Sequence, residues 1–370
     1  MIKVCHMTSA HGEEDVRIFH KECVSLAKAG YDTYLVERGE SREKDGVHIV
    51  GVGEIPKSRR KRMIEGAKKV YEAARAVDAD IYHFHDPELL PYGMKLKRAG
   101  KKVIFDSHEF YREQMHEKKY LPTWLRNCVA AVYGAYEDHV LRYCDAVISP
   151  CTLNGKSFFE NRCRRVAIIS NAAILGEFFD LYDPNTTKED RQVCYVGGLT
   201  EARGISADIK AAYQANAVIA LAGSFSPECY GETLKEMLEY ACVRHLGSID
   251  RSGVRELLRE SQIGLCTLQD VGQYLKVDTF GIKVYEYLSM ALPVILSHSF
   301  YNDYMIERYH FGICVDPINV DEIADAIRYL LDHPDEARQM GENGRRAVKE
   351  EFNWGVEEKK LLALYEDILK

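Results

Sequence analysis

Several features that mark other classes of protein are missing from this sequence of 370 residues. No apolar run approaches the roughly 20 residues that a membrane-spanning helix needs, so we expect no such helix. The first residues, MIKVCHMTSA, carry no basic leader followed by an apolar stretch, which predicts a first strand and no signal peptide. None of the eleven cysteines belongs to a CxxC pair, so we expect buried, reduced thiols in place of disulfides or zinc ligands. A cytoplasmic location follows from these expectations.

An excess of basic residues is also missing, because the formal net charge is −8. This balance argues against a nucleic-acid partner. The hydrophobic content of 46% and the charged content of 29% are typical of a water-soluble globular protein.

One short segment opposes the acidic balance. Residues 57–69, within PKSRRKRMIEGAKKV, carry lysines and arginines against the single acidic Glu65. Two interpretations remain open: a solvated helix face, or a patch attracted to the anionic headgroups of a membrane. The second interpretation would place the protein at the inner face of the membrane, acting on a polyprenyl-linked acceptor.

The length predicts two domains, because 370 residues exceed one ordinary core and fit two of roughly 170–200 residues. Short apolar runs alternate with helix-patterned stretches in both halves, which predicts parallel sheets with helices on both faces. The apolar runs lie at 2–7, 33–36, 80–84, 102–106 and 145–149, and again from 192 and at 217–223, 242–248, 263–268, 292–297 and 312–317. The helical period is present at 16–29, 61–77 and 120–143.

A polar, turn-rich stretch around 168–190 separates the two series of strands. We therefore expect the α/β class, with two Rossmann-like, doubly wound domains at 1–170 and 171–354 that face each other across a cleft. Ligands bind outside the carboxyl ends of such strands.

The segment DTFGIKVYEYLSMALPVI at 278–295 carries the strongest chemical signal. Asp278 and Glu286 are eight residues apart and bracket a turn at Phe280 and Gly281. Carboxylates at this spacing suit the vicinal diols of a ribose and a hexose, because each oxygen can accept a hydroxyl proton.

A helix that begins near Ile282 would direct its first amide groups at a phosphate or at sugar hydroxyls. Lys283 would add a full positive charge there, and Glu286 would share its face of the helix. The alternative is an amphipathic helix with a Lys–Glu surface pair, followed by a core strand.

This segment resembles the signature of glycosyltransferase family 4, which are retaining enzymes of GT-B fold. In that signature two acidic residues flank a Phe-Gly turn, and an EY(L/M)A.G.PVI run follows. The resemblance implies that Asp278 contacts the transferred sugar and that Glu286 contacts the nucleotide ribose. Asp278 departs from the usual glutamate and is one methylene shorter.

A second stretch, YVGGLTEARGI at 195–205, resembles the VGRL...KG loop of the family, whose two basic residues hold the diphosphate. Arg203 matches the second basic position, whereas Gly198 stands where arginine is common. The resemblance therefore implies a diphosphate clamp of Arg203 and Lys283. Arginine offers a planar fork to two phosphate oxygens, and lysine offers a compact charge.

In the first half, the loop MTSAHGEEDVRIFHKEC at 7–23 resembles the family loop beneath the diphosphate and the acceptor. Gly12 permits close approach of the backbone to a ligand, and Asp15 and Arg17 lie near the expected helix start. The loop lacks the GxGxxG spacing of a dinucleotide site.

Two strands end in polar residues, at YHFHDPELLP and FDSHEFY, and are expected to line one wall of the cleft. The resemblance places His108 beside the reacting sugar carbon, and Asp86 and Glu109 in the acceptor region with His85. For His83 we expect a structural hydrogen bond to the backbone. These histidines lack the HExxH spacing of a zinc site, so no metal is expected.

The resemblance implies a retaining, metal-independent glycosyltransferase. Its donor would be a nucleotide-diphosphate sugar, with UDP the commoner base among similar proteins, and no other cofactor is expected. A hexose or N-acetylhexosamine would pass to a glycan or lipid-linked acceptor in surface polysaccharide synthesis. The last helix, at 355–370, would pack back on the first domain. A sugar-nucleotide epimerase of the same fold and a non-catalytic sugar-binding protein remain as alternatives.

Overall fold

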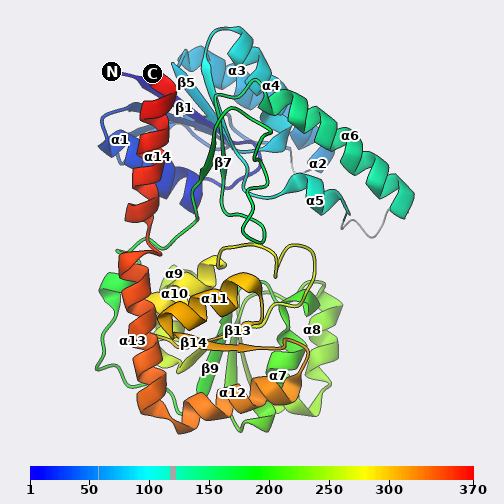
Figure 1. Ribbon diagram of the computed structural model, residues 1–370, viewed down its shortest axis with the longest axis vertical. Coiled ribbons are helices and arrows are strands. Elements are labelled where there is room, and N and C mark those ends of the chain that lie inside the picture. Colours follow the sequence, from blue (N-terminus) through cyan, green and yellow to red (C-terminus); the bar gives the residue numbers. More distant parts are fainter. Residues whose placement is uncertain (57, 117–121) are drawn as a thin grey trace. The chain divides into compact units, whose positions relative to one another are not determined.

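The computed structural model describes residues 1–56, 58–116 and 122–370, which divide into two compact units (Figure 1). Unit 1 comprises Met1–Asn171 and Gly355–Lys370, and unit 2 comprises Ala172–Trp354. Unit 1 is therefore discontinuous in sequence, because nearly all of the C-terminal helix α14 (Trp354–Leu369) belongs to it.

Unit 1 contains an eight-stranded sheet in the order β3-β4-β2-β1-β5-β6-β7-β8. All neighbouring strands are parallel except β3 and β4. The strands are β1 (Lys3–Met7), β2 (Asp32–Glu37), β3 (Arg42–Lys44), β4 (Val47–Gly51), β5 (Ile81–Phe84), β6 (Lys102–Asp106), β7 (Ala146–Ser149) and β8 (Val166–Ile168).

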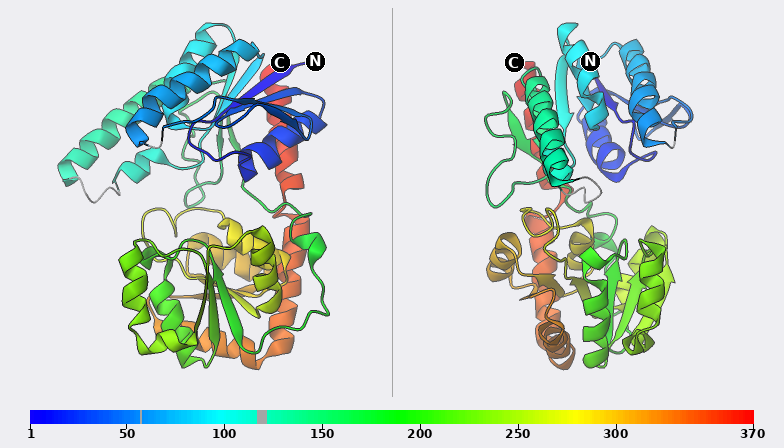
Figure 2. Two further views of the ribbon diagram at one scale, coloured as in Figure 1. Left: turned by 180° about the vertical axis from the view of Figure 1, so that it is seen from behind. Right: turned by 90° about the vertical axis from the view of Figure 1, so that its right-hand side faces the viewer.

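Helices cover both faces of this sheet (Figure 2). Successive side chains of β5 point to opposite faces and contact different helices. The Tyr82 hydroxyl donates to Ala74 O of α3, whereas the next residue, His83, contacts Tyr365 of α14. The helical elements are η1 (Val16–Cys23), α1 (Val24–Lys28), α2 (Arg59–Lys61), η2 (Arg62–Gly66), α3 (Ala67–Val77), η3 (Pro87–Leu89), α4 (Leu90–Arg98), α5 (Tyr111–His116) and α6 (Thr123–Leu141).

Unit 2 contains a six-stranded parallel sheet in the order β11-β10-β9-β12-β13-β14. Its strands are β9 (Gln192–Val196), β10 (Val218–Ala222), β11 (Val243–Gly247), β12 (Ile263–Cys266), β13 (Val294–Ser297) and β14 (Gly312–Val315). Its helices are α7 (Ile205–Gln214), α8 (Glu228–Lys235), α9 (Arg251–Glu260), α10 (Ile282–Ser289), α11 (Phe300–Tyr309), α12 (Val320–Asp332) and α13 (Pro334–Glu350), with short turns η4 (Phe179–Leu181), η5 (Glu201–Arg203) and η6 (Leu238–Cys242).

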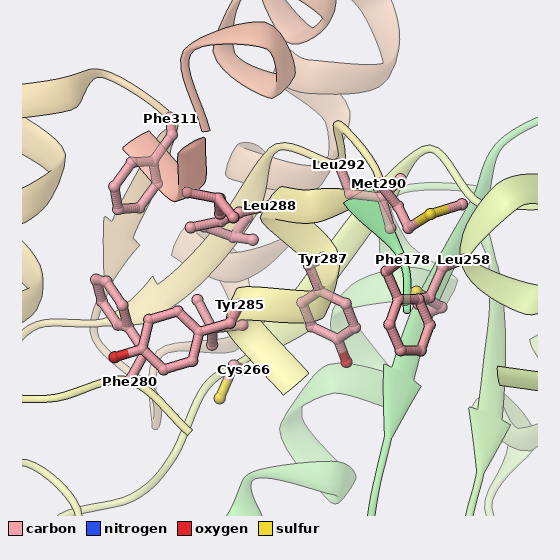
Figure 3. Packing of buried hydrophobic residues seen from close by; sticks show 14 of the residues in the cluster. Phe178, Leu258, Cys266, Phe280, Tyr285, Tyr287, Leu288, Met290, Leu292 and Phe311 are labelled. Atoms are coloured by element: carbon pink, nitrogen blue, oxygen red, sulfur yellow. The ribbon is translucent and has the colours of Figure 1, made fainter. Parts of the chain in front are cut away.

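Two apolar cores lie on opposite faces of the unit 2 sheet, because successive side chains of a strand alternate. On β9, Cys194 joins the core that includes α10, and Tyr195 joins the core that includes α7. The first core holds Tyr287 against the strand (Figure 3). A Cβ at Gly264 would lie 2.3 Å from the Tyr287 ring, so only glycine permits this packing. The Tyr287 hydroxyl also accepts the Val196 N–H at 2.9 Å, which fixes α10 to the end of β9.

The apolar runs of the sequence predicted β1, β2, β5, β6 and β7 of unit 1 and the six strands of unit 2 to within a few residues, but not β3 or β4. The predicted parallel sheets are confirmed, and the sheet of unit 1 carries in addition a short edge strand, β3, that is antiparallel to β4. Strand β3 contains only Arg42, Glu43 and Lys44, so no apolar pattern could reveal it. Residues 120 and 121 of the predicted helix 120–143 lie outside the described residues. In the part of the chain that is described, no helix is both long and apolar enough to cross a bilayer.

Candidate functional site

Two cations flank a glycine at the carboxyl end of β9. Gly197 has a φ of 128°, a conformation that side chains rarely adopt. A Cβ at this position would lie 3.1 Å from Lys283 Nζ and 3.2 Å from Arg203 Nη1. Because Gly197 has no side chain, both positive charges can lie close to the same short stretch of backbone. The sequence interpretation named Gly198 and missed Gly197.

Lys283 is the second residue of α10, which begins at Ile282 as predicted. Its Nζ lies 3.6 Å from the centroid of the Tyr195 ring. This nitrogen is buried and has no hydrogen-bond partner among residues 1–56, 58–116 and 122–370. Burial, with a further contribution from the neighbouring Arg203 guanidinium, lowers the pKa of Lys283 to about 8. An ammonium group placed in this way favours an anion as its partner.

Arg203 ends η5 and is followed by Gly204, which has a φ of 76°. A Cβ at Gly204 would lie 2.2 Å from the Thr267 carbonyl oxygen, so the turn that directs Arg203 requires glycine. Arg203 Nη1 lies 3.5 Å from Gly198 O. At Gly198 a Cβ would make only an ordinary contact of 3.5 Å with the guanidinium.

Glu286 is buried on α10, and its Oε1 accepts a hydrogen bond of 2.5 Å from Arg251 Nη1. Arg251 also pairs with Glu177. Neither Arg251 nor Glu177 was predicted as part of the site. Arg251 lies 35 residues from Glu286 and 74 residues from Glu177 in the sequence, and pairs this far apart leave no periodic signal. The arrangement places the Glu286 carboxylate against the Arg251 guanidinium, on the same helix as Lys283.

The remaining predicted residues of this segment differ in exposure. The side chain of Phe280 is 5% exposed and packs against Tyr301 and Phe352, so only its backbone is available to a ligand (Figure 3). Gly281 is the exposed N-cap of α10, and Ile282 is 44% exposed. Asp278 is half-buried in the irregular segment between β12 and α10.

Unit 1 has a cavity of about 790 Å³ at the carboxyl ends of β1, β5 and β6. Its lining includes four residues that the sequence predicted for the acceptor side, Asp15, Arg17, Asp86 and Glu109, together with His108, which was predicted beside the reacting sugar carbon. Its other lining residues include His11, Arg62, Met63, Ile64, Glu88 and Tyr111. The predicted residues Gly12 and His85 are outside the lining, although each adjoins one of its members in sequence or by hydrogen bond.

Asp86 organises the loop that follows β1. Its Oδ2 accepts the N–H groups of Ser9 and Ala10 at 2.6 and 3.1 Å and the Thr8 hydroxyl at 2.9 Å. Its Oδ1 lies 3.1 Å from His11 Nδ1. Burial alone would raise the pKa of Asp86, but the bonds from His11 and the loop hold it below its usual range. Asp86 therefore fixes the loop that contains Gly12 as well as lining the cavity.

Arg17, His85 and His108 meet at Asp106, which the sequence interpretation did not name. Arg17 binds both Asp106 oxygens at 2.9 and 3.0 Å, and Asp15 caps η1 by accepting the Arg17 N–H at 2.9 Å. His108 Nε2 lies 3.3 Å from Asp106 Oδ2 and 3.1 Å from His85 Nδ1. The signal for Asp106 was its place at the end of the apolar strand KVIFD.

Two family profiles match the chain. The profile of "Glycosyl transferases group 1" matches residues 180–347, and that of "Glycosyltransferase Family 4" matches residues 17–173. A segment of 52 residues is 42% identical to the MMP α-(1→4)-mannosyltransferase of Mycolicibacterium hassiacum. That segment is 14% of this chain and 13% of that protein.

Solved structures are similar over nearly the whole chain. Sucrose-phosphate synthase of Thermosynechococcus elongatus aligns with a TM-score of 0.79 at 17% identity, covering 100% of this chain and 99% of that one. HepE of Anabaena, solved with UDP and glucose, aligns with a TM-score of 0.72 at 13% identity, covering 99% and 100%. WaaG, a glycosyltransferase involved in lipopolysaccharide biosynthesis, has a TM-score of 0.70 at 15% identity, covering 98% and 99%. The predicted α/β class of GT-B type is confirmed.

The space beside Gly197 gives a first prediction. We expect Gly197→Ala to weaken binding of UDP by at least about 10-fold, because the added methyl group meets both cations and the backbone must leave its positive φ. Isothermal titration calorimetry would measure the change. Gly176→Ala is the matched control, since a Cβ at Gly176 meets nothing within 4 Å. Equal affinities of the two variants would contradict the prediction.

The lowered pKa of Lys283, about 8, gives a second prediction. Below pH 8 the ammonium is charged, and above pH 8 it loses its proton, so affinity for UDP should fall as the pH rises from 7 to 9. The fall is limited to about tenfold per pH unit for one proton. The Lys283→Arg variant keeps its charge throughout this range, so its affinity should change less with pH. Any titration of UDP itself affects both proteins equally and cancels when they are compared. Parallel slopes for the two proteins would show that Lys283 does not contact the anion.

Proposed function

The chain belongs to the glycosyltransferases of group 1 and family 4, and we propose that it transfers a hexose or N-acetylhexosamine from a UDP-sugar with retention of configuration. We propose a glycan or polyprenyl-linked acceptor in surface polysaccharide synthesis. The observation that carries the proposal is the pair of cations beside Gly197. The presence of UDP and glucose in the related HepE structure supports the choice of donor.

The cation pair suits the charge that develops when a nucleotide diphosphate departs. As the bond between the anomeric carbon and the phosphate oxygen breaks, negative charge collects on the β-phosphate. Arg203, Lys283 and the first amide groups of α10 would stabilise that charge, with electrostatics that need no metal. We propose that Glu286, held by Arg251, accepts the ribose hydroxyls, and that Asp278 contacts the transferred sugar.

Retention follows if the acceptor oxygen attacks from the face that the phosphate leaves. In this step the acceptor O–H proton passes to the departing phosphate oxygen, and the products are the glycoside and UDP. No protein nucleophile is required. His108 would lie beside the reacting carbon, where Asp106 and His85 fix the orientation of its ring. The cavity of unit 1 would take the acceptor.

Basic and apolar side chains occur together beside that cavity. In segment 57–69, Lys57 lies outside the described residues, and the side chains of Arg60, Lys61, Lys68 and Lys69 are exposed. Met63 and Ile64 are 42% and 61% exposed and also line the cavity. This combination supports attraction to an anionic membrane surface that carries a lipid-linked acceptor, at the cytoplasmic face.

Replacement of either clamp residue tests the proposed reaction. We expect Lys283→Ala and Arg203→Ala each to lower kcat by about 100-fold or more, because each removes a charge that acts on the leaving group. Release of UDP, measured by a coupled assay at saturating donor, gives the rate. Release should require an acceptor, which distinguishes transfer from epimerisation. Near-normal kcat in both variants would remove the clamp from the mechanism, and Lys210→Ala on the surface of α7 serves as the control.

Vesicle sedimentation tests the membrane proposal. We expect binding to vesicles with anionic lipid at low salt and its loss at high salt. Lys61→Ala with Lys68→Ala should weaken binding by about 30-fold, from about 1 kcal/mol for each charge. The matched control removes two exposed lysines elsewhere, Lys349 and Lys359. Equal binding by both double variants, or no binding at low salt, would contradict the proposal.

A further inference from the structure

Three histidines and a glutamate meet in the interior of unit 1, beneath the cavity. They are His6 of β1, His83 and His85 of β5, and Glu22 of η1, and all four are 0% exposed. Glu22 Oε2 lies 3.9 Å from His6 Nδ1, 3.8 Å from His83 Nε2 and 4.0 Å from His85 Nε2. His6 Nδ1 and His85 Nε2 are 3.0 Å apart. Four potential ligand atoms therefore surround one point.

The register of the sheet brings the histidines together. His6 is the direct partner of His83 in the parallel pair of β1 and β5, so their side chains share a face. His85 is two residues beyond His83 and returns to the same face. Glu22 approaches these histidines from η1. The four residues come from β1, β5 and η1, so no short zinc motif in the sequence marks them.

The outer nitrogen of each imidazole already has a partner. His6 Nε2 and His83 Nδ1 lie 3.2 and 2.8 Å from the Tyr365 hydroxyl, and His85 Nδ1 lies 3.3 Å from Asp106 Oδ2. The predicted bond of His83 to the backbone is therefore replaced by one to a side chain. If these three nitrogens carry the protons, the hydroxyl oxygen accepts two of them and Asp106 accepts the third. All three inner nitrogens then present lone pairs, as in metal-ligating histidines.

Two of the inner groups lack hydrogen bonds. Glu22 Oε2 and His83 Nε2 are buried and accept no hydrogen bond from an N–H group of any described residue, and the Asp106 carboxylate lies beside the Glu22 carboxyl group. Glu22 Oε1 is 3.2 Å from Arg17 Nε, an ion pair that leaves Oε2 directed at the three imidazoles. A carboxylate buried in this way is costly unless a cation or donor satisfies it.

We propose that His6 Nδ1, His83 Nε2, His85 Nε2 and Glu22 Oε2 bind one divalent transition metal, with zinc the best match. A tetrahedral zinc ion with Zn–N distances of about 2.0–2.1 Å separates its ligand atoms by about 3.3 Å. Four of the separations between these atoms are 3.0 to 4.0 Å, and all of the atoms lie within 4.8 Å of one another. Four protein ligands close the site, so its role is structural: it joins β1, β5 and η1 and, through Tyr365, the C-terminal helix. This departs from our expectation of no metal, and it leaves the transfer chemistry unchanged.

Metal analysis of the full chain is the first test. We expect about one zinc ion per chain by mass spectrometry after purification from zinc-supplemented culture. X-ray absorption should show only nitrogen and oxygen neighbours near 2.0–2.1 Å. Sulfur neighbours near 2.3 Å would assign the metal to some of the eleven free cysteines and overturn the proposal. Absence of metal, with no rise in Tm when Zn²⁺ or Co²⁺ is added to chelator-treated protein, would also overturn it.

Two variants locate the site. Tyr365→Phe removes the shared acceptor and should weaken zinc affinity by about 10–100-fold, as outer-shell changes do. Glu22→Gln keeps the shape of the side chain and should weaken it further. His298→Ala is the control, because His298, Asp303 and Cys314 form an exposed group that could also hold an ion. Loss of zinc from His298→Ala, with retention in Tyr365→Phe, would place the metal elsewhere. If Glu22→Gln does not fold, Tyr365→Phe and the absorption spectrum still decide.

Discussion

The candidate site of unit 2 depends on two positive charges that are held close together beside one glycine. Lys283 and Arg203 repel each other, and the fold must supply the force that keeps both beside Gly197. The aromatic face of Tyr195 supports the ammonium, and the turn at Gly204 directs the guanidinium. Neither contact neutralises a charge, so the electrostatic strain persists until an anion arrives. Such stored repulsion favours binding of an anion over a neutral ligand.

Packing at a distance from the charges makes this arrangement rigid. The Tyr287 ring fits against Gly264 and its hydroxyl accepts the Val196 N–H, so the helix that carries Lys283 cannot slide along the strand that carries Gly197. Unit 1 uses a different device. There a single buried carboxylate, Asp106, orients Arg17, His85 and His108 at once. One unit is organised by apolar contact and the other by a polar network.

Most strands, the start of α10 and the two cations could be predicted from the sequence, because these features depend on local patterns. The strands are apolar runs, and the start of α10 at Ile282 follows from the Phe-Gly turn before it. Lys283 and Arg203 were named from motifs. What escaped prediction depends on distant pairing: Arg251 with Glu286, Asp106 with Arg17, and Glu22 with three histidines of two strands. A sequence records which residues are present, whereas the register of a sheet decides which of them meet.

The divided unit 1 has a consequence for synthesis on the ribosome. Unit 2 is continuous in sequence, so all of its residues are synthesised before Gly355–Lys370, which unit 1 needs for its helix α14. During that interval His6 and His83 have no Tyr365 to accept their hydrogen bonds, and the part of the first sheet that packs against α14 is uncovered. The first sheet, although its strands are made first, is therefore covered by α14 only after unit 2 has been synthesised, and until then the nascent chain would need shielding from aggregation there.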